Sequence, residues 1–247
     1  MRIDVLTIFP QLFETIFNWG VISRALEKEI IVFEAVDIRD FTDDRHRTTD
    51  DYPFGGGSGL VMKAEPILRA VASRFTENSR PYIIYPSPQG KVFDNKKALE
   101  LSKLNHITFI CGRYEGIDER VMSVVDEELS IGDFVLSGGE VPAILMIEAV
   151  SRFIPGVIGD MESVINDSFF SELLDHPHYT RPREVNGIEV PEVLLSGNHE
   201  MIEIQRRVES LRRTIERRPD IFLKHEFDLS DKKALLMLFE ELRKDVE

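Results

Sequence analysis

Cysteine and tryptophan are nearly absent from this sequence of 247 residues, which contains one of each. With Cys111 as the single cysteine, the chain cannot form an intrachain disulfide or a zinc site built from CxxC pairs, and one thiol fits a reducing compartment. No apolar run approaches the ~20 residues of a membrane span. The apolar start, MRIDVLTIFP, ends at Pro10 without a small-residue cleavage site, so we interpret it as a first strand rather than a signal peptide. We therefore expect a cytoplasmic protein with no membrane partner.

Positive charge is also scarce, because the chain has 30 Lys and Arg but 44 Asp and Glu, which gives a formal net charge of -14. Taken whole, such a chain is a poor partner for nucleic acid, whose phosphates are bound by Lys and Arg. The arginines are clustered, however, in segments 39–47 and 205–218. Local fields matter more than the total charge, so either segment can contact phosphate. Glu209 and Glu216 interrupt the second segment and leave a solvated helix face as its alternative.

Short β-like runs alternate with amphipathic segments up to residue 153, a pattern typical of an α/β fold with a mostly parallel sheet. A proline at the start of a helix is well tolerated, and Pro10 and Pro66 each lead an amphipathic segment. The pattern predicts strands at 3–9, 30–38, 82–85, 107–111 and 124–131. It predicts helices at 10–18, 21–28, 66–75, 95–104 and 141–153.

The character of the sequence changes after Pro155. Segment 156–167 has weak periodicity and indicates a connection between domains. Beyond residue 168 no convincing strand is apparent, and helices are predicted at 200–218 and 230–243, the second capped by Ser230. We expect an α/β domain at 1–158, a flexible linker at 159–167 and a helical domain at 168–247.

The densest glycine cluster, Gly55 to Gly59, matches none of the familiar phosphate-binding loops. Leu60 occupies the last glycine position of GxGxxG, and the Gly-Lys-Ser/Thr ending of a P-loop is missing. The same leucine excludes the GxSxG turn that carries a nucleophilic serine. A flexible substrate loop and a plain surface loop are both open for this segment.

Three β-like runs end in small or turn-forming residues, at 85–90, 111–116 and 130–140. Glycine lets backbone groups approach a ligand, and α/β sheets bind ligands at the carboxyl ends of parallel strands. We therefore infer a site for a nucleoside-like ligand. Arg152 and Asp167 flank the expected linker, where the residue types alone favour a helix-end arginine and a turn aspartate.

The six histidines show no HExxH motif and no pair spaced i, i+4. The closest pair, His176 and His178, is separated by Pro177, which argues against two metal ligands on one helix face. We predict no metal site here and interpret these histidines as hydrogen-bonding or RNA-contacting groups.

Longer motifs carry a resemblance to one protein family. They are RDFTDDRHRTTDD at 39–51, YPFGGGSGLVM at 52–62, CGRYEGIDERV at 111–121, SIGDFVLSGGE at 130–140, SRFIPGV at 151–157, DSF at 167–169, HPHYTRP at 176–182 and VLLSGNH at 193–199. In this order, and over nearly the full chain, they closely resemble bacterial tRNA (guanine-N1)-methyltransferases, the TrmD type of the SPOUT superfamily.

The resemblance implies an α/β fold whose mostly parallel sheet forms a deep trefoil knot, followed by a small helical domain that binds tRNA. It implies methyl transfer from S-adenosylmethionine to N1 of guanosine 37, in the anticodon stem-loop of tRNAs with G at position 36. The family acts as a homodimer in which two subunits build each active site. Dependence on Mg²⁺ is a further expectation, although no carboxylate cluster in the sequence identifies a site.

Site residues are carried over by position. Asp167 matches the general base, Arg152 the arginine that stabilises charge on O6, and Glu115 a residue near the sulfonium. The sequence departs from the family at Phe134, where Tyr is common, and at Pro86, where many relatives have Leu. The donor pocket implied by the resemblance comprises Tyr85, Ser87, Pro88, Gly112, Ser130, Ile131, Gly132, Asp133, Phe134, Val135, Leu136, Gly138, Gly139 and Pro142. The expected tRNA-binding residues are Arg45, Arg47, Asp50, Gly57, Gly59, His178, Arg181, Arg206 and Arg213.

Two other functions share part of this pattern. A non-catalytic RNA-binding protein would keep the arginines and glycines but would need neither Asp167 nor Arg152. A related methyltransferase acting on a ribose 2′-hydroxyl or on ribosomal RNA would keep the donor loops, but should lack the DSF and HPHYTRP segments.

Overall fold

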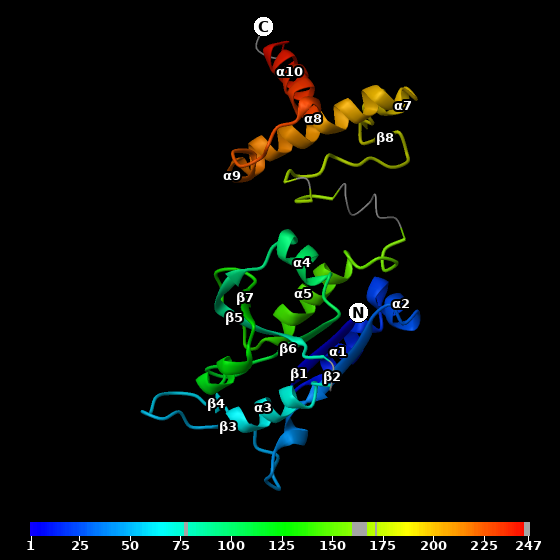
Figure 1. Cartoon of the computed structure of the whole chain (residues 1–247). Helices are drawn as coiled ribbons and strands as arrows, with labels where there is room; N and C mark the ends of the chain where they lie inside the picture. Colours follow the sequence, from blue (N-terminus) through cyan, green and yellow to red (C-terminus); the bar gives the residue numbers. More distant parts are fainter. Residues whose placement is uncertain (77–78, 160–166, 171, 245–247) are drawn as a thin grey trace. The chain divides into compact units, whose positions relative to one another are not determined.

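The computed structural model describes residues 1–76, 79–159, 167–170 and 172–244. The chain divides into two compact units, Met1–Gly159 and Asp160–Glu247, each of which is described by itself (Figure 1). Of the expected linker at 159–167, the stretch 160–166 lies outside the described residues.

A five-stranded sheet organises the first unit, in the order β2-β1-β6-β5-β7, and all of its neighbouring strands are parallel (Figure 1). The central strand β1 buries every residue from Ile3 to Thr7, on both faces, as expected for a parallel sheet covered by helices. This confirms the predicted parallel α/β fold. The strands are β1 (Arg2–Thr7), β2 (Val32–Asp37), β5 (Tyr82–Val92), β6 (His106–Ile110) and β7 (Glu127–Ser130), with a separate antiparallel pair β3 (Asp50–Asp51) and β4 (Val61–Met62).

Helices lie around this sheet (Figure 1). On α3, Ile67 and Val71 are fully buried in one cluster with Leu6 and Ile110 of the central strands. Each large aliphatic side chain buried in this way stabilises the fold by about 1.5–3 kcal/mol. The helices are α1 (Pro10–Phe17), α2 (Gly20–Glu27), α3 (Ala64–Ala72), α4 (Asn95–Leu101) and α5 (Glu140–Ser151), with short 3₁₀ helices at Ile38–Phe41 and Glu119–Val124.

Strand β5 is much longer than predicted. The sequence predicts a strand at 82–85 and a loop at 85–90, but β5 continues to Val92. Its pairing with β7 shifts register, since Pro86 and Lys91 both oppose Leu129 and the residues between them bulge from the ladder. A bulge accommodates proline because the unpaired residues need no ladder hydrogen bond. Gly90 fits closely here, as a Cβ atom would come within 2.4 Å of the backbone carbonyl carbon of Glu128.

Two predicted boundaries in the first unit are also wrong. Helix α3 begins at Ala64, so Pro66 is the third helical residue rather than the first. The first four helical N–H groups have no partner within the helix, and proline therefore costs no hydrogen bond there. The strand predicted at 124–131 begins at Glu127, because a 3₁₀ helix occupies the chain up to Val124.

The second unit is built around α8 and α10, which pack through Val208, Leu211, Ala234 and Leu238 over the buried Leu173. Helices are predicted correctly at both places, although α10 begins at Leu229. No helix in the described part of the chain combines the length and apolar character that a bilayer span needs. The elements are β8 (Glu184–Val185), β9 (Ile188–Glu189), α7 (Glu192–Leu195), α8 (His199–Arg217), α9 (Pro219–Phe222) and α10 (Leu229–Lys244).

Two corrections concern this unit. The antiparallel pair β8–β9 stands where no strand was predicted, joined by Asn186 and Gly187 at φ values of 53° and 78°. Asn-Gly with positive φ at both positions is the usual signal for a type I′ hairpin. The N-cap of α10 is Asp228 instead of Ser230, because the Asp228 side chain accepts a 2.8 Å hydrogen bond from the backbone N–H of Asp231.

Candidate functional site

The β5 bulge and the chain segments that follow β6 and β7 converge on a cavity of about 450 Å³. This volume falls within the range of about 300–1,000 Å³ that small-molecule sites occupy. The lining segments are 85–89, 112–117, 128–132 and 134–139, together with Glu119, Met122 and Pro142. They include every residue expected for the donor pocket except Asp133, which is exposed and does not line the cavity.

Glycines allow these segments to pack directly on one another. The backbone N–H of Gly139 donates to the carbonyl of Gly112 at 2.9 Å. A Cβ atom on Gly139 would lie 3.0 Å from the Cα of Cys111, and one on Gly112 would lie 2.9 Å from the Tyr85 ring and hydroxyl. Larger residues would therefore push the segments apart, which explains why glycine occupies these positions.

One buried carboxylate joins three parts of the site. Glu140, the first residue of α5, accepts hydrogen bonds from the Thr7 hydroxyl at 2.8 Å and from Nε of Arg113 at 2.9 Å. The Arg113 guanidinium also lies over the Phe9 ring, 4.6 Å from its centroid, and donates to the Ser137 carbonyl at 3.4 Å. The carboxylate thus ties the end of β1 to the segments after β6 and β7. A buried carboxylate requires such partners, because an unpaired buried charge is strongly destabilising.

Sequence reasoning missed the roles of Arg113 and Glu140. An acidic residue in the first turn of a helix is ordinarily a solvent-exposed partner of the helix dipole. The one available signal is the apolar sequence that follows Glu140, which indicates that this end of the helix is buried.

Acidic side chains outnumber basic ones in the lining of the cavity. The carboxylates of Glu115, Glu119 and Glu128 line it, whereas Arg113 is paired with Glu140. Burial raises the pKa of the Tyr85 phenol, and burial raises the pKa of the Cys111 thiol well above its ordinary value. Both groups therefore stay protonated at neutral pH, so Cys111 is not a nucleophile. The net field favours a positively charged ligand.

The glycine cluster borders the segment that carries Glu115. The backbone N–H of Glu115 donates to the carbonyl of Leu60 at 3.0 Å, and a Cβ atom on Gly59 would lie 2.4 Å from Glu115 Oε1. Asp50 of β3 hydrogen-bonds the Tyr114 phenol, whose pKa is raised by burial and by this carboxylate. The structure therefore brings Asp50 and Gly59 next to Glu115, whereas Gly57 faces open space with φ +125°.

Arg152 and Asp167 belong to different units, so each is described within its own unit. Arg152 is the C-cap residue of α5 in the first unit. Asp167 lines a groove of about 1040 Å³ in the second unit, together with Asp175, His176 and Arg206. The Asp167 carbonyl accepts a 3.3 Å hydrogen bond from the backbone N–H of Phe170, which places the aspartate in a turn.

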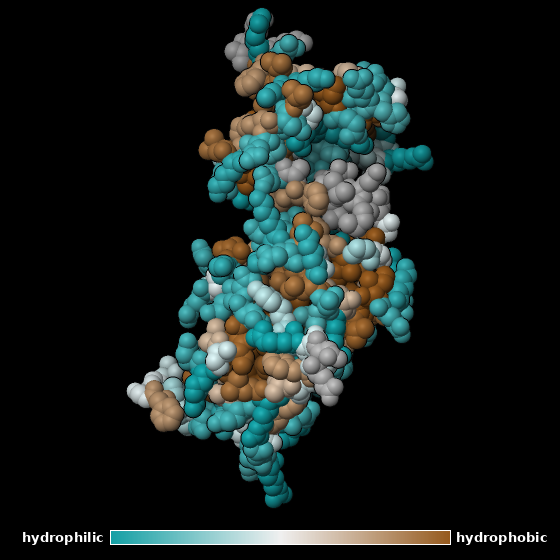
Figure 2. Space-filling model, in the orientation of Figure 1, coloured by the Kyte–Doolittle hydropathy of each residue, from teal (hydrophilic) through white to brown (hydrophobic). Residues whose placement is uncertain are grey.

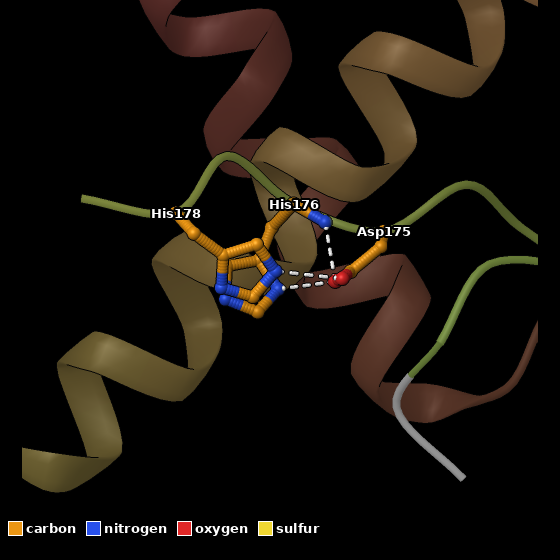
Figure 3. Close-up of side chains that lie close together, drawn as sticks. All are labelled: Asp175, His176 and His178. Carbon is orange, nitrogen blue, oxygen red and sulfur yellow. Dashed lines mark hydrogen bonds and ion pairs between the residues drawn. The ribbon is translucent and has the colours of Figure 1, made fainter. Parts of the chain in front are cut away.

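Asp175 holds two imidazole rings (Figure 3). Its Oδ1 lies 2.8 Å from Nδ1 of His176, and its Oδ2 lies 2.7 Å from Nε2 of His178. The ring centroids are 4.4 Å apart. The expected tRNA contact His178 therefore belongs to a cluster with Asp175 and His176.

The other residues expected to bind tRNA are spread over both units. Arg45 and Arg181 are exposed, and Arg213 is half-buried. Arg47 pairs with Asp40 and lies 3.6 Å from Asp37, and Arg206 pairs with Glu203 at 2.7 Å. Surface ion pairs of this kind contribute about 0–1 kcal/mol, so a phosphate can compete for either arginine.

Fold and cavity together define an α/β protein with a cavity of small-molecule size at the carboxyl ends of parallel strands, where such folds bind their ligands. A family model described as tRNA (Guanine-1)-methyltransferase TrmD matches residues 1–224. Two proteins named tRNA (guanine-N(1)-)-methyltransferase, from Thermosipho africanus and Fervidobacterium nodosum, are 60% and 57% identical over 247 residues and the full length of both chains. The Thermotoga maritima protein of the same name is 54% identical over 242 residues, 98% of each chain. The chain therefore belongs to the TrmD family of tRNA (guanine-N1)-methyltransferases, as its motifs predicted.

Proposed function

We propose that this chain methylates N1 of guanosine 37 in tRNAs that carry G at position 36, with S-adenosylmethionine as the methyl donor. One observation carries the proposal: the segments expected to bind the donor converge on a single glycine-lined, acidic cavity. They do so in a chain that belongs to the TrmD family.

The residues of the cavity fit the donor in size and charge. The volume of about 450 Å³ suits a nucleoside-sized ligand, and Gly112 and Gly139 let backbone groups approach it. When bound, S-adenosylmethionine supplies a methyl carbon on a positively charged sulfur, which leaves as a neutral thioether. The carboxylate of Glu115, which lines the cavity, would attract this positive charge.

Asp167 and Arg152 carry out the proton and charge chemistry at the guanine. N1 of guanine bears a proton and is a poor nucleophile until that proton leaves. In the proposed reaction the Asp167 carboxylate takes the N1 proton as the new N–CH₃ bond forms. The Arg152 guanidinium stabilises the negative charge that develops on O6. General-base assistance of this kind is worth about 10²–10⁴-fold in rate.

The proposal includes a homodimer and a trefoil knot in the first unit. Helix α5 leaves Val141 and Leu145, one turn apart, 55% and 46% exposed, and Trp19 is 78% exposed. Figure 2 shows hydrophobic residues reaching the surface of this unit. Apolar side chains spaced one turn apart suit a second copy of the chain, which would cover them. The backbone hydrogen bond from Gly139 to Gly112 suits a knot, because it joins the two segments that the knot would interlock.

The tRNA would be held through its phosphates by arginines of both units, among them Arg45, Arg206 and Arg213. Guanosine 37 must leave the base stack to expose its N1 edge. The cluster Gly55 to Gly59 borders Glu115 and supplies a loop that can order around the extruded base. For Mg²⁺, the one group of potential metal ligands found among the described residues contains two histidines, so we propose no Mg²⁺ site.

Methyl transfer from labelled S-adenosylmethionine to three tRNA transcripts tests the proposal. A transcript with G36 and G37 should yield 1-methylguanosine at position 37, whereas transcripts with A36–G37 or G36–A37 should yield little or none. Asp167→Ala should abolish turnover, while Asp220→Ala, which removes an exposed partner of Arg218, should retain it. Label on ribose or on ribosomal RNA, or no transfer at all, would contradict the proposed function.

A further inference from the structure

We propose that Asp175, His176 and His178 form a binding site for a divalent transition-metal ion, with Zn²⁺ as the fitting metal. The inference stands apart from the methyl-transfer proposal, because it rests on three side chains of the second unit and its test is metal binding alone. It also differs from the sequence-based expectation, which considered two histidines on one helix face. The cluster instead lies on an extended segment, where His-Pro-His brings both rings to one side (Figure 3).

The ligand atoms lie close to the spacing that a metal needs. One ligand atom from each of the three side chains lies within 4.8 Å of the other two. Ligands bound to zinc at about 2.0–2.2 Å are about 3.4 Å apart in a tetrahedron. The two nitrogen–oxygen distances of 2.8 Å and 2.7 Å would have to widen by less than 1 Å, roughly a side-chain adjustment. The His178 side chain is 69% exposed, so water can supply the fourth ligand.

The segment that carries the ligands is fixed in place before any metal binds. The backbone N–H of Leu174 donates to the Thr214 hydroxyl at 3.0 Å, and the Leu174 carbonyl accepts from the Ser210 hydroxyl at 2.5 Å. Both hydroxyls belong to buried residues of α8. The backbone N–H of His176 donates to Asp175 Oδ1 at 2.7 Å, which restricts the carboxylate. A preorganised ligand set loses less entropy when it binds an ion.

One cationic side chain lies near the cluster. Arg206 of α8 lines the same groove as His176, and its positive charge disfavours a bound cation. The Arg206 guanidinium is paired with Glu203 at 2.7 Å, which offsets part of this charge.

The donor set also selects the class of ion. Two imidazole nitrogens and one carboxylate oxygen suit Zn²⁺ and similar transition metals, whereas Mg²⁺ and Ca²⁺ prefer oxygen ligands throughout. The Asp175 carboxylate contacts both rings and repels phosphate, which argues against an anion site.

A bound metal would stiffen the segment next to Asp167. The backbone N–H of Asp175 donates to the Ser168 hydroxyl at 2.9 Å, and Asp175 and His176 line the same groove as Asp167. An ion held by Asp175 would therefore order the chain that carries the proposed base. Binding itself can be measured without tRNA or methyl donor.

Calorimetric titration of the full-length, chelator-treated protein with zinc chloride tests the site. We expect one Zn²⁺ per chain. His178→Ala and Asp175→Asn should each lower the affinity for Zn²⁺ at least about tenfold, because mutating even a residue that only hydrogen-bonds a metal ligand lowers metal affinity by about 10–100-fold. His46→Ala is the matched control, because His46 is exposed in the first unit and should leave binding unchanged. Circular dichroism checks folding of each variant, and the high exposure of His178 makes its variant the safest for the fold.

The inference is overturned if the parent protein binds no Zn²⁺ in the micromolar range, or if His178→Ala and Asp175→Asn both bind as tightly as the parent. It is overturned equally if His46→Ala weakens binding as much as His178→Ala does. Competition by millimolar Mg²⁺ would contradict the class of metal. Retained methyl transfer by a protein that binds no Zn²⁺ would reject this site and leave the proposed function intact.

Discussion

Replacing Glu140 with alanine should destabilise the first unit and weaken binding of the methyl donor, because this carboxylate holds the segments after β6 and β7. The Glu140 side chain is 1% exposed and its partner Arg113 is 24% exposed. Removing one partner of a buried ion pair costs about 3–5 kcal/mol. Arg113 can still reach water after the change, so we expect the lower end, about 3 kcal/mol. The buried Thr7 hydroxyl also loses its acceptor.

Urea unfolding monitored by circular dichroism measures the free energy of unfolding, and calorimetry measures donor affinity. Glu140→Gln keeps the shape and an acceptor for Thr7 but leaves Arg113 without its counter-charge, so it should cost less, about 1–3 kcal/mol. Glu148→Gln changes an exposed residue of the same helix and should stay within about 0.5 kcal/mol of the parent. If Glu140→Ala is as stable as Glu148→Gln and binds the donor equally well, the carboxylate does not hold the site together.

Three further predictions concern acid stability, the arginine and salt. Burial would raise the pKa of Asp231, but hydrogen bonds from Arg207 and His225 outweigh burial and hold this pKa below its ordinary value of 3.8. The Asp231 carboxylate therefore stabilises the fold above pH 3.8, and this stabilisation is lost as the pH falls through the folded-state pKa. Unfolding of Asp231→Asn should show a large stability deficit at pH 7 that shrinks towards pH 2, and an equal deficit at both would refute this assignment. Arg152→Lys should remain severely slowed in single-turnover assays, since lysine lacks the planar fork of two donors, and a rate equal to the parent would rule out bidentate contact. Affinity for tRNA in filter binding should fall steeply between low and moderate salt, whereas a flat dependence would contradict phosphate contacts.

The elements that the sequence predicts well are those decided by local pattern. Strand β1 is a continuous apolar run, and Pro10 marks the start of α1. The length of β5 could not be predicted, because pairing with β7 across a bulge decides whether residues after Pro86 stay in the sheet. The strands of β8–β9 are two residues long and too short to show a period, although their Asn-Gly turn was a usable signal.

The sequence predicts which segments form the cavity, but it does not predict the side-chain contacts that hold those segments together. Parallel strands place their carboxyl ends at one edge, so segments ending three such strands were expected to meet, and they do. The contact between Glu140 and Thr7 joins residues 133 positions apart, which no local pattern reveals. The cluster at Asp175 depends on how α8 anchors Leu174, which the spacing of the histidines cannot show.

The affinity of S-adenosylmethionine for Gly112→Ala and Gly159→Ala, measured by calorimetry beside the parent, tests most directly whether the glycine-lined cavity holds the donor. A Cβ atom on Gly112 would meet Tyr85 at 2.9 Å inside the cavity wall, whereas one on Gly159 has nothing within 4 Å and no positive φ to strain it. We predict that Gly159→Ala binds as the parent does and that Gly112→Ala binds at least about tenfold more weakly, a difference of about 1.4 kcal/mol. Equal affinity in all three proteins would contradict the placement of the donor in this cavity.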